Sequence, residues 1–209
     1  RPIPLDSFSE SLILALWSGG TDAISDEVRA AVASNFSVAM KALAVEFEKT
    51  TAHHVVLSFG STGKHYAQIK NGAPFDVFLA ADAARPALLE NQGIANAGSR
   101  TTYARGKLVL WTSKPDVNDV QDILLNSQDV RHLALANPKL SPYGMAAQQA
   151  MVELNVWPKL QAKIVRGENI AQTFQFVHSG NAELGFVAYS QVVNPKRSVQ
   201  GSFWMPPQS

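Results

Sequence analysis

Residues 55–82 read VVLSFGSTGKHYAQIKNGAPFDVFLAAD, and the rest of the fold prediction extends from this segment. Its first five residues, 55–59, form an apolar run that predicts a buried strand, and a glycine- and hydroxyl-rich turn follows. Residues 64–70 predict a short helix that stops at an Asn-Gly pair, and residues 75–80 predict a second strand. A strand, a helix and a strand in this order are typical of a parallel sheet with helices on its faces.

The same alternation continues on both sides of this segment, so the sequence predicts an α/β protein with mainly parallel sheets. Asn35 or a neighbour is expected to cap the first helix, and Asp82 the third. The predicted strands cover residues 28–33, 55–59, 75–80, 108–112, 132–136, 163–166 and 184–189, and the predicted helices cover residues 38–49, 64–70, 83–90, 119–125, 144–154 and 170–178.

Two series of strands and helices meet near residues 103–107, which predicts two lobes joined by a hinge. A second joint near residues 189–194 would carry the chain back to the first series. Lobe 1 is therefore expected to consist of residues 26–104 plus 190–209, and lobe 2 of residues 105–189.

Residues 1–25 are interpreted as a signal-like or disordered segment that stands outside the fold. Leu12 to Trp17 form a short apolar run, and Ala23 and Ser25 place small residues at positions −3 and −1 of a cut after Ser25. These features resemble the apolar core and cleavage site of an export signal.

Composition excludes several classes of function. The 209 residues carry a net charge of +1, which argues against a nucleic-acid binder with its basic excess. The absence of cysteine excludes disulfides, thiolate zinc sites and cysteine nucleophiles. No apolar run reaches the roughly 18 residues that a membrane span requires.

Small, hydroxyl and amide residues stand at four strand-to-helix junctions. In an open parallel sheet, ligands bind beyond the carboxyl ends of the strands, where helix N-termini present unpaired N–H groups and a partial positive charge. Such junctions can bind an anion, although plain helix capping requires the same residue types. The four junctions are Ser34-Asn35, Ser61-Thr62, Tyr143-Gly144 and Asn169-Ile170.

Other chemistries find little support in the sequence. It contains neither a phosphate-binding GxxxxGK[ST] motif nor a GxSxG nucleophile elbow. His65 and His132 lack acidic partners at the spacing of metal ligands. Asp76 and Asp82 bracket a predicted strand, where carboxylates can serve acid–base chemistry but more commonly anchor loops and cap helices.

Several of these segments closely resemble periplasmic molybdate-binding proteins, the substrate-binding components of molybdate ABC transporters. The resemblance covers about residues 27–191, and the stretch GAPFDVFLAAD is specific for this family. The segments that carry it are residues 33–40, 58–64, 72–82, 137–144 and 184–187.

The resemblance implies a type II periplasmic-binding fold, with two lobes that close on tetrahedral molybdate or tungstate. Molybdenum would be bound as its oxyanion, with no direct metal ligands and no further cofactor. Some family members also use a tyrosine hydroxyl in the last strand, a place that Ala188 takes here, so Tyr189 is expected to face away. The ligand contacts carried over from the family fall on Ser34, Asn35, Ser61, Thr62, Tyr143 and, through its backbone N–H, Ile170.

The resemblance further implies a non-enzymatic, monomeric, exported protein of the periplasm that hands its ligand to an ABC permease in the inner membrane. Three alternatives stay open at this point. The same scaffold could bind another tetrahedral oxyanion such as sulfate, phosphate or a phosphonate. It could be the effector-sensing module of a transcription regulator, or an enzyme that uses Asp76 or Asp82 as a base.

The C-terminal end departs from the family pattern. Eighteen residues follow Gln191, whereas family members add a further strand and helices to the first lobe. The sequence therefore predicts a fragment or a prematurely ended product. Its lobe 1 is expected to be incomplete, to expose an apolar flank and to be less stable.

Overall fold

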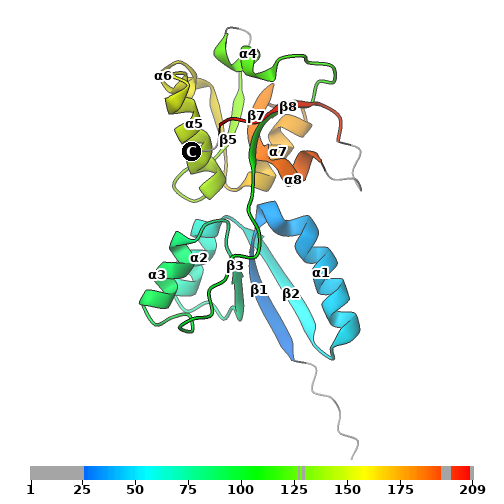
Figure 1. Ribbon diagram of the computed structural model, residues 1–209, viewed down its shortest axis with the longest axis vertical. Helices are drawn as coiled ribbons and strands as arrows, with labels where there is room; N and C mark the ends of the chain where they lie inside the picture. The colour runs from blue at the N-terminus through cyan, green and yellow to red at the C-terminus, as the bar shows by residue number, and fades with distance from the viewer. Residues whose placement is uncertain (1–25, 127, 129, 194–198, 208–209) are drawn as a thin grey trace, which may run out of the picture.

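The computed structural model describes residues 26–126, 128, 130–193 and 199–207, which form two lobes lying one above the other (Figure 1). Each lobe contains its own sheet with helices packed against it. The signal-like segment, residues 1–25, lies outside the described residues. Within the described ranges, no helix has both the length and the apolar character needed to cross a membrane.

Lobe 1 is built on a parallel sheet with the strand order β2-β1-β3. Ala33 at the end of β1 is paired with Gly60 at the end of β2, so both strands stop at the same edge of the sheet. That edge faces lobe 2 (Figure 1). The elements of lobe 1 are β1 (Glu27–Ala33), the 3-10 helix η1 (Ser34–Phe36), α1 (Ser37–Thr50), β2 (His54–Gly60), α2 (Thr62–Lys70), β3 (Val77–Leu79) and α3 (Ala84–Asn91).

Lobe 2 contains a mixed sheet with the strand order β6-β5-β7-β4-β8. Strand β5 runs parallel to β6 and β7, whereas β4 is antiparallel to both β7 and β8. Its elements are β4 (Leu108–Thr112), α4 (Val120–Leu125), β5 (Leu133–Ala136), α5 (Pro142–Glu153), α6 (Trp157–Leu160), η2 (Gln161–Lys163), β6 (Ile164–Gly167), α7 (Ile170–His178), β7 (Leu184–Ala188), α8 (Tyr189–Val192) and β8 (Ser202–Trp204).

Every strand and helix predicted between residues 28 and 189 is present, with ends that agree within two residues. The elements that the sequence did not predict are short: η1, α6, η2, α8 and β8 have three or four residues each. Segments of that length carry too few residues to display a hydrophobic period.

Asp76 makes β3 begin later than predicted. Its backbone N–H donates to the Arg29 carbonyl at 2.9 Å, and its carboxylate accepts from the Arg29 N–H at 2.8 Å. The side chain therefore replaces the next bond of the strand ladder, and β3 begins only at Val77.

The helix caps agree with the sequence at one position and not at another. Asp82 lies one residue before the N-cap position of α3, and it accepts a hydrogen bond from the Arg85 N–H at 2.9 Å, so it partners a donor of the first turn as expected. Asn35, by contrast, does not cap α1, and neither does a neighbouring side chain. The chain enters α1 through the 3-10 turn η1, which places Asn35 inside the turn instead of ahead of it.

The C-terminal residues correct the predicted division of the chain. Residues 202–204 were assigned to lobe 1 with the rest of 190–209, but as β8 they pair with β4 in lobe 2. Strand β8 thus pairs with the edge of β4 that β7 leaves open, and Trp204 packs on the main apolar core of lobe 2. The Ser202 hydroxyl also accepts from the Val117 N–H at 3.1 Å.

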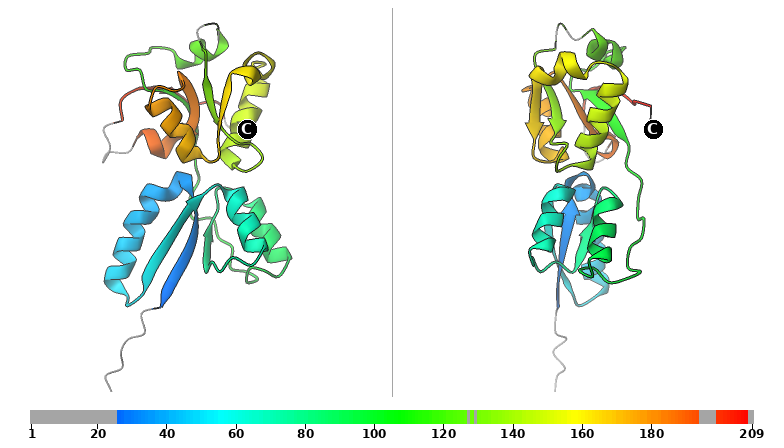
Figure 2. Two further views of the ribbon diagram at one scale, coloured as in Figure 1. Left: turned by 180° about the vertical axis from the view of Figure 1, so that it is seen from behind. Right: turned by 90° about the vertical axis from the view of Figure 1, so that its left-hand side faces the viewer.

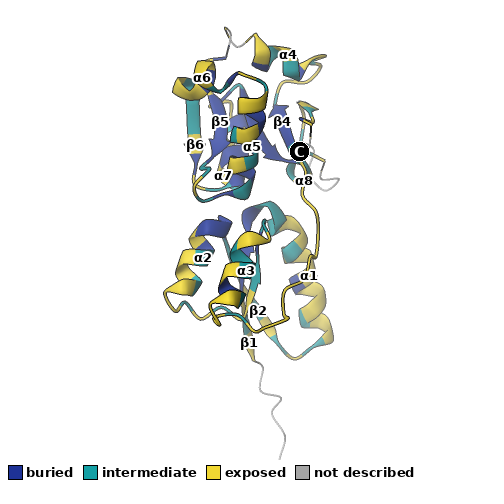
Figure 3. Cartoon of the chain, turned by 60° about the vertical axis from the view of Figure 1, so that its left-hand side comes forward, coloured by how far each residue is buried: buried dark blue, intermediate teal, exposed yellow. Residues whose placement is uncertain are grey.

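The two lobes differ in how well they bury apolar side chains (Figure 3). The described core clusters are formed by lobe 2 residues, and strands β5 and β7 are buried along their full length. In lobe 1, strands β2 and β3 are only partly buried, and Val77, Leu88 and Ile94 are each 45% exposed. The expected apolar flank of lobe 1 is therefore present.

A segment without helix or strand, residues 92–107, connects α3 to β4 and runs along one side of the molecule (Figure 2). The Tyr103 hydroxyl fixes this segment to lobe 1 by donating to the Ala80 carbonyl at 2.8 Å. At its other end the Lys107 carbonyl accepts from the Tyr189 N–H at 2.9 Å, just after β7. These bonds hold the connection close to the boundary between the lobes.

Candidate functional site at the lobe boundary

In lobe 1 the candidate residues lie where β1 and β2 end. Ser34 follows β1 directly, and Ser61 follows β2 and caps α2, its hydroxyl accepting from the Lys64 N–H at 3.3 Å. Thr62 is the first residue of α2 and is almost fully buried. Its hydroxyl accepts from the Ala81 N–H at 3.0 Å, which ties the start of this helix to the chain leaving β3.

In lobe 2 the candidate residues lie at the starts of α5 and α7. Asn169 caps α7 by accepting from the N–H groups of Ala171 and Gln172 at 3.0 and 3.1 Å, so the cap does not use the first N–H of the helix, that of Ile170. Tyr143 lies in the first turn of α5, which begins at Pro142.

The start of α5 packs directly against the end of β5. Ser141 caps α5, its hydroxyl accepting from the Gly144 N–H at 3.4 Å. A Cβ on Gly144 would overlap the Ala136 carbonyl, so only glycine permits this approach. The Tyr143-Gly144 junction is therefore capped by Ser141, which the sequence analysis did not single out.

Hydrogen bonds across the lobe boundary connect the end of β1 in lobe 1 to the starts of helices in lobe 2. The Ser34 hydroxyl donates to the Asn169 side-chain oxygen at 3.3 Å, and the Asn35 side chain lies close enough to the Tyr143 hydroxyl to lower its pKa. The Ser190 hydroxyl donates to the Asn35 carbonyl at 3.2 Å. The end of β1 is thus in contact with the starts of α5, α7 and α8.

A small apolar cluster surrounds the same point. Tyr143 and Ile170 pack together with Ala136 and Ala188, and Ala81 from lobe 1 packs against them. Because the Ala81 N–H is also bonded to the Thr62 hydroxyl, the cluster links Ser61 and Thr62 of lobe 1 to Tyr143 and Ile170 of lobe 2. We call Ser34, Asn35, Ser61, Thr62, Tyr143 and Ile170 the interlobe site.

The interlobe site holds polar groups without ionised side chains. Burial raises the pKa of Tyr143 to about 12, helped by nearby Tyr103 and opposed by the hydrogen bond to Asn35, so its hydroxyl is neutral at physiological pH. The other members of the site are hydroxyl, amide and backbone groups. The site can therefore offer N–H and O–H donors to an anion, with no fixed cation and no carboxylate among its members.

The two carboxylates considered as catalytic bases already have structural partners. Asp76 is bonded to the backbone of Arg29, and Asp82 caps α3 and forms an ion pair with Arg85. Neither arrangement favours a catalytic base or a receptor for a protonated phosphate. Within the described part of the chain, no three His, Asp or Glu side chains are grouped so as to hold a metal ion.

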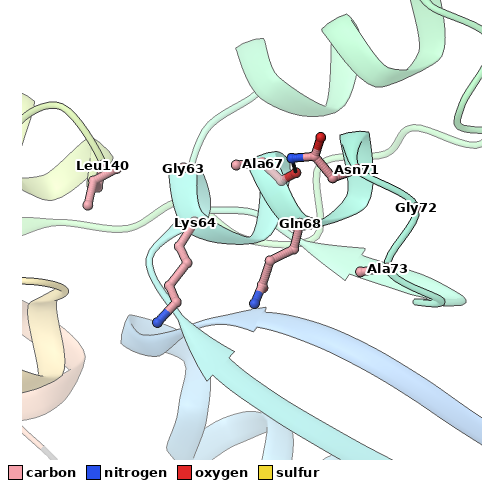
Figure 4. A pocket seen from close by; sticks show the side chains of 8 residues that line it. All are labelled: Gly63, Lys64, Ala67, Gln68, Asn71, Gly72, Ala73 and Leu140. Carbon is pink, nitrogen blue, oxygen red and sulfur yellow. Dashed lines mark hydrogen bonds between the residues drawn. The ribbon is translucent and has the colours of Figure 1, made fainter.

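A second contact between the lobes lies beside the site and was not foreseen from the sequence. The Gly63 N–H donates to the Leu140 carbonyl at 2.8 Å, and the Arg85 guanidinium donates to the Lys139 carbonyl at 3.3 Å. Leu140 also closes one end of a pocket along α2, whose wall includes Lys64 and Gln68 (Figure 4). In the sequence, only Gly63 of the Ser61-Thr62-Gly63 turn signals that another part of the backbone approaches so closely.

A wide groove adjoins the interlobe site on the side of lobe 1. It has a volume of about 1580 Å³, and Asn35 and Tyr143 line it where it reaches the lobe boundary. Apolar side chains such as Phe78 and Leu79 form much of its lobe 1 wall. Three exposed apolar side chains of lobe 1 also line the groove, namely Val38, Val77 and Ile94.

Comparison with known proteins identifies the family. The sequence model of a family described as bacterial extracellular solute-binding protein matches residues 28–209. The molybdate-binding protein ModA of Azotobacter vinelandii is 51% identical over 204 residues, which cover 96% of this chain and 81% of the relative. The chain belongs to the ModA family of bacterial extracellular solute-binding proteins.

Further comparisons agree with this family. The molybdate-binding protein ModA of Rhodobacter capsulatus is 46% identical over 196 residues, covering 93% of this chain and 76% of the relative. The solved structure of the Azotobacter vinelandii periplasmic molybdate-binding protein aligns with a TM-score of 0.81 and 44% identity, covering 86% of this chain and 79% of that one. The expected type II periplasmic-binding fold is confirmed, and these relatives are named as molybdate-binding proteins.

Proposed function

We propose that this protein binds molybdate or tungstate at the interlobe site and delivers it to an ABC permease. Membership of the ModA family supports the ligand class. The observation that carries the assignment of the site is the convergence of uncharged polar groups from both lobes at one point, above all the hydrogen bonds from Ser34 to Asn169 and from Ser190 to Asn35.

Uncharged donors are sufficient to hold a dianion. A micromolar dissociation constant corresponds to about −8 kcal/mol. Roughly six hydrogen bonds to a charged group, at about 1.5–3 kcal/mol each, supply more than this before the costs of association and lobe closure are subtracted. With no buried cation to be left unpaired, the same site can also release its ligand to a partner.

The remaining parts of the proposal follow from this role. The ligand is the cargo, and no cofactor is required. The protein acts in the periplasm, as a monomer, with the permease in the inner membrane as its partner, and it performs no chemical reaction on the anion. Support for these points comes from the family, whose named members are molybdate-binding proteins.

Isothermal titration with molybdate, tungstate, sulfate and phosphate tests the proposal. Saturable binding of the first two, and weaker binding of the others, is the expected result. Because the candidate donors lie at the lobe boundary, Asn35→Asp should abolish binding by placing a negative charge against the dianion. Asn118→Asp, the same change at an exposed position before α4, is the matched control and should bind normally.

Two outcomes would contradict the proposal. Binding of phosphate alone would assign the scaffold to another oxyanion. Unchanged molybdate affinity in Asn35→Asp would show that the ligand binds elsewhere on the protein.

A further inference from the structure

We infer that His65 is a positioning residue of the interlobe site, whose imidazole sets the spacing between the two loops of lobe 1 that present Ser34 and Ser61–Thr62. The inference rests on the proposed function. It concerns a side chain of α2 that touches neither the ligand contacts carried over from the family nor lobe 2, and that acts through the backbone beneath them.

The ring lies between the ends of two adjacent strands. His65 is 2% exposed, and its Nε2 atom lies 3.2 Å from the carbonyl oxygen of Val32, two residues before Ser34. The same nitrogen faces Gly60, where a Cβ would come within 2.9 Å of it. Since Gly60 directly precedes Ser61, the imidazole touches the chain just ahead of both loops.

The other sides of the ring are also held. With Nε2 donating to the Val32 carbonyl, the Nδ1 atom of the neutral ring is an acceptor, and the side-chain amide of Gln68, 3.1 Å away in the next turn of α2, can donate to it through its nitrogen. Phe75 and Phe78 meet the ring edge-on, with ring centres 5.8 and 6.4 Å away. A ring in contact on all these sides keeps one orientation. It therefore restricts the movement of the backbone that it contacts at Val32 and Gly60.

Strand pairing alone leaves the loops less well defined. The last pair of the β1–β2 ladder is Ala33 with Gly60, so Ser34 and Ser61 lie beyond the final backbone partner. The hydrogen bond from His65 to the Val32 carbonyl adds a fixed point one residue before that end. Donors to an oxyanion must be placed within a few tenths of an ångström to form short hydrogen bonds, and this contact stiffens the ends that carry them.

Two substitutions separate positioning from simple space filling. His65→Leu fills most of the volume but cannot donate to the Val32 carbonyl, whereas His65→Gln keeps an N–H donor of similar reach. We expect His65→Leu to weaken molybdate binding about tenfold at a temperature where circular dichroism shows it folded, and His65→Gln to stay within about threefold of the parent protein. Gly60→Ala, which pushes the ring away, should resemble His65→Leu and serves if that variant does not fold.

Amide hydrogen exchange gives a readout that does not depend on the ligand. The backbone of residues 34–36 and 61–64 should exchange faster in His65→Leu and at the parent rate in His65→Gln. Lower thermal stability in His65→Leu with unchanged affinity and unchanged exchange at these residues would overturn the inference. If the parent protein itself fails to bind molybdate, the proposed function is wrong, and the exchange comparison still decides the role of His65.

Discussion

The backbone N–H of Gly63 in lobe 1 donates a 2.8 Å hydrogen bond to the carbonyl of Leu140 in lobe 2. This bond lies one residue from Thr62 and three from Tyr143, so the two lobes touch directly beside the interlobe site. A Cβ at Gly63 would lie 2.8 Å from that same oxygen. The lobes can approach this closely only because the second residue of α2 is a glycine.

Gly63→Ala should therefore prevent full closure of the lobes. Because bound ligand must then be held by donors that are slightly too far apart, we expect molybdate affinity to fall about tenfold, a free energy of about 1.4 kcal/mol. Small-angle scattering with saturating molybdate should give a larger radius of gyration than the parent protein. Lys64→Ala, an exposed change in the same helix, is the control, and equal affinities in both variants would contradict the expectation.

The fold was predictable where a pattern extends over many residues. The strands ending at Ala33 and Gly60 and the helices that follow them were placed from apolar runs and turn residues alone. Asp76 shows where this stops, since a carboxylate bonded to the backbone of Arg29 shortened β3 without any local signal. Strand β8 was missed for a similar reason, because three residues pair with β4 on the strength of tertiary contacts.

The sequence predicted which strand-to-helix junctions form the candidate site, but it did not predict how their side chains are arranged relative to one another. Junction chemistry singled out Ser61 and Asn169, and both cap helices as expected. Asn35 was expected to cap α1, but its carbonyl instead accepts from the Ser190 hydroxyl across the boundary, a relationship between residues more than one hundred positions apart. The contacts of Leu140 and His65 were beyond reach for the same reason, since nothing in their neighbouring sequence specifies which distant backbone they meet.

Tyr143→Phe tests the hydroxyl at the boundary. Loss of one hydrogen bond of about 0.5–1.5 kcal/mol should weaken molybdate binding roughly threefold to tenfold. Because the pKa of Tyr143 is raised to about 12, the affinity of the parent protein should show no titration of this group between about pH 7 and pH 9. An affinity loss near pH 9 that disappears in Tyr143→Phe would show that the hydroxyl ionises in the ordinary range.

The raised pKa of Tyr143 also predicts how stability changes in base. Since the folded pKa lies above the unfolded value of about 10, the contribution of this group is complete below that pH and is lost as the pH rises toward 12. Urea unfolding at increasing pH should therefore show a steeper loss of stability in the parent protein than in Tyr143→Phe. Parallel curves for the two proteins would contradict this.

The lobes should differ in local stability. Lobe 2 buries β5 and β7 completely, whereas β2 and β3 of lobe 1 are only partly buried and expose Val56 and Val77. Backbone amides of β5 and β7 should therefore exchange hydrogen most slowly, and those of β2 and β3 earlier and at lower denaturant. If the slowest amides of both sheets exchanged at the same rate, the two lobes would unfold together, which would contradict this prediction.

His65 provides a second pH dependence, in acid. Burial is the largest cause of the lowered pKa of His65, and neighbouring Lys64 adds to it, so the folded protein favours the neutral ring. The unfolded chain takes up the proton first, at about pH 6.5, which means that the stabilising contribution is complete above that pH and is lost as the pH falls. The difference in unfolding free energy between the parent protein and His65→Gln should therefore shrink between about pH 7.5 and pH 5.5. A difference that stays constant over this range would mean that the ring takes up its proton equally well in the folded and the unfolded chain.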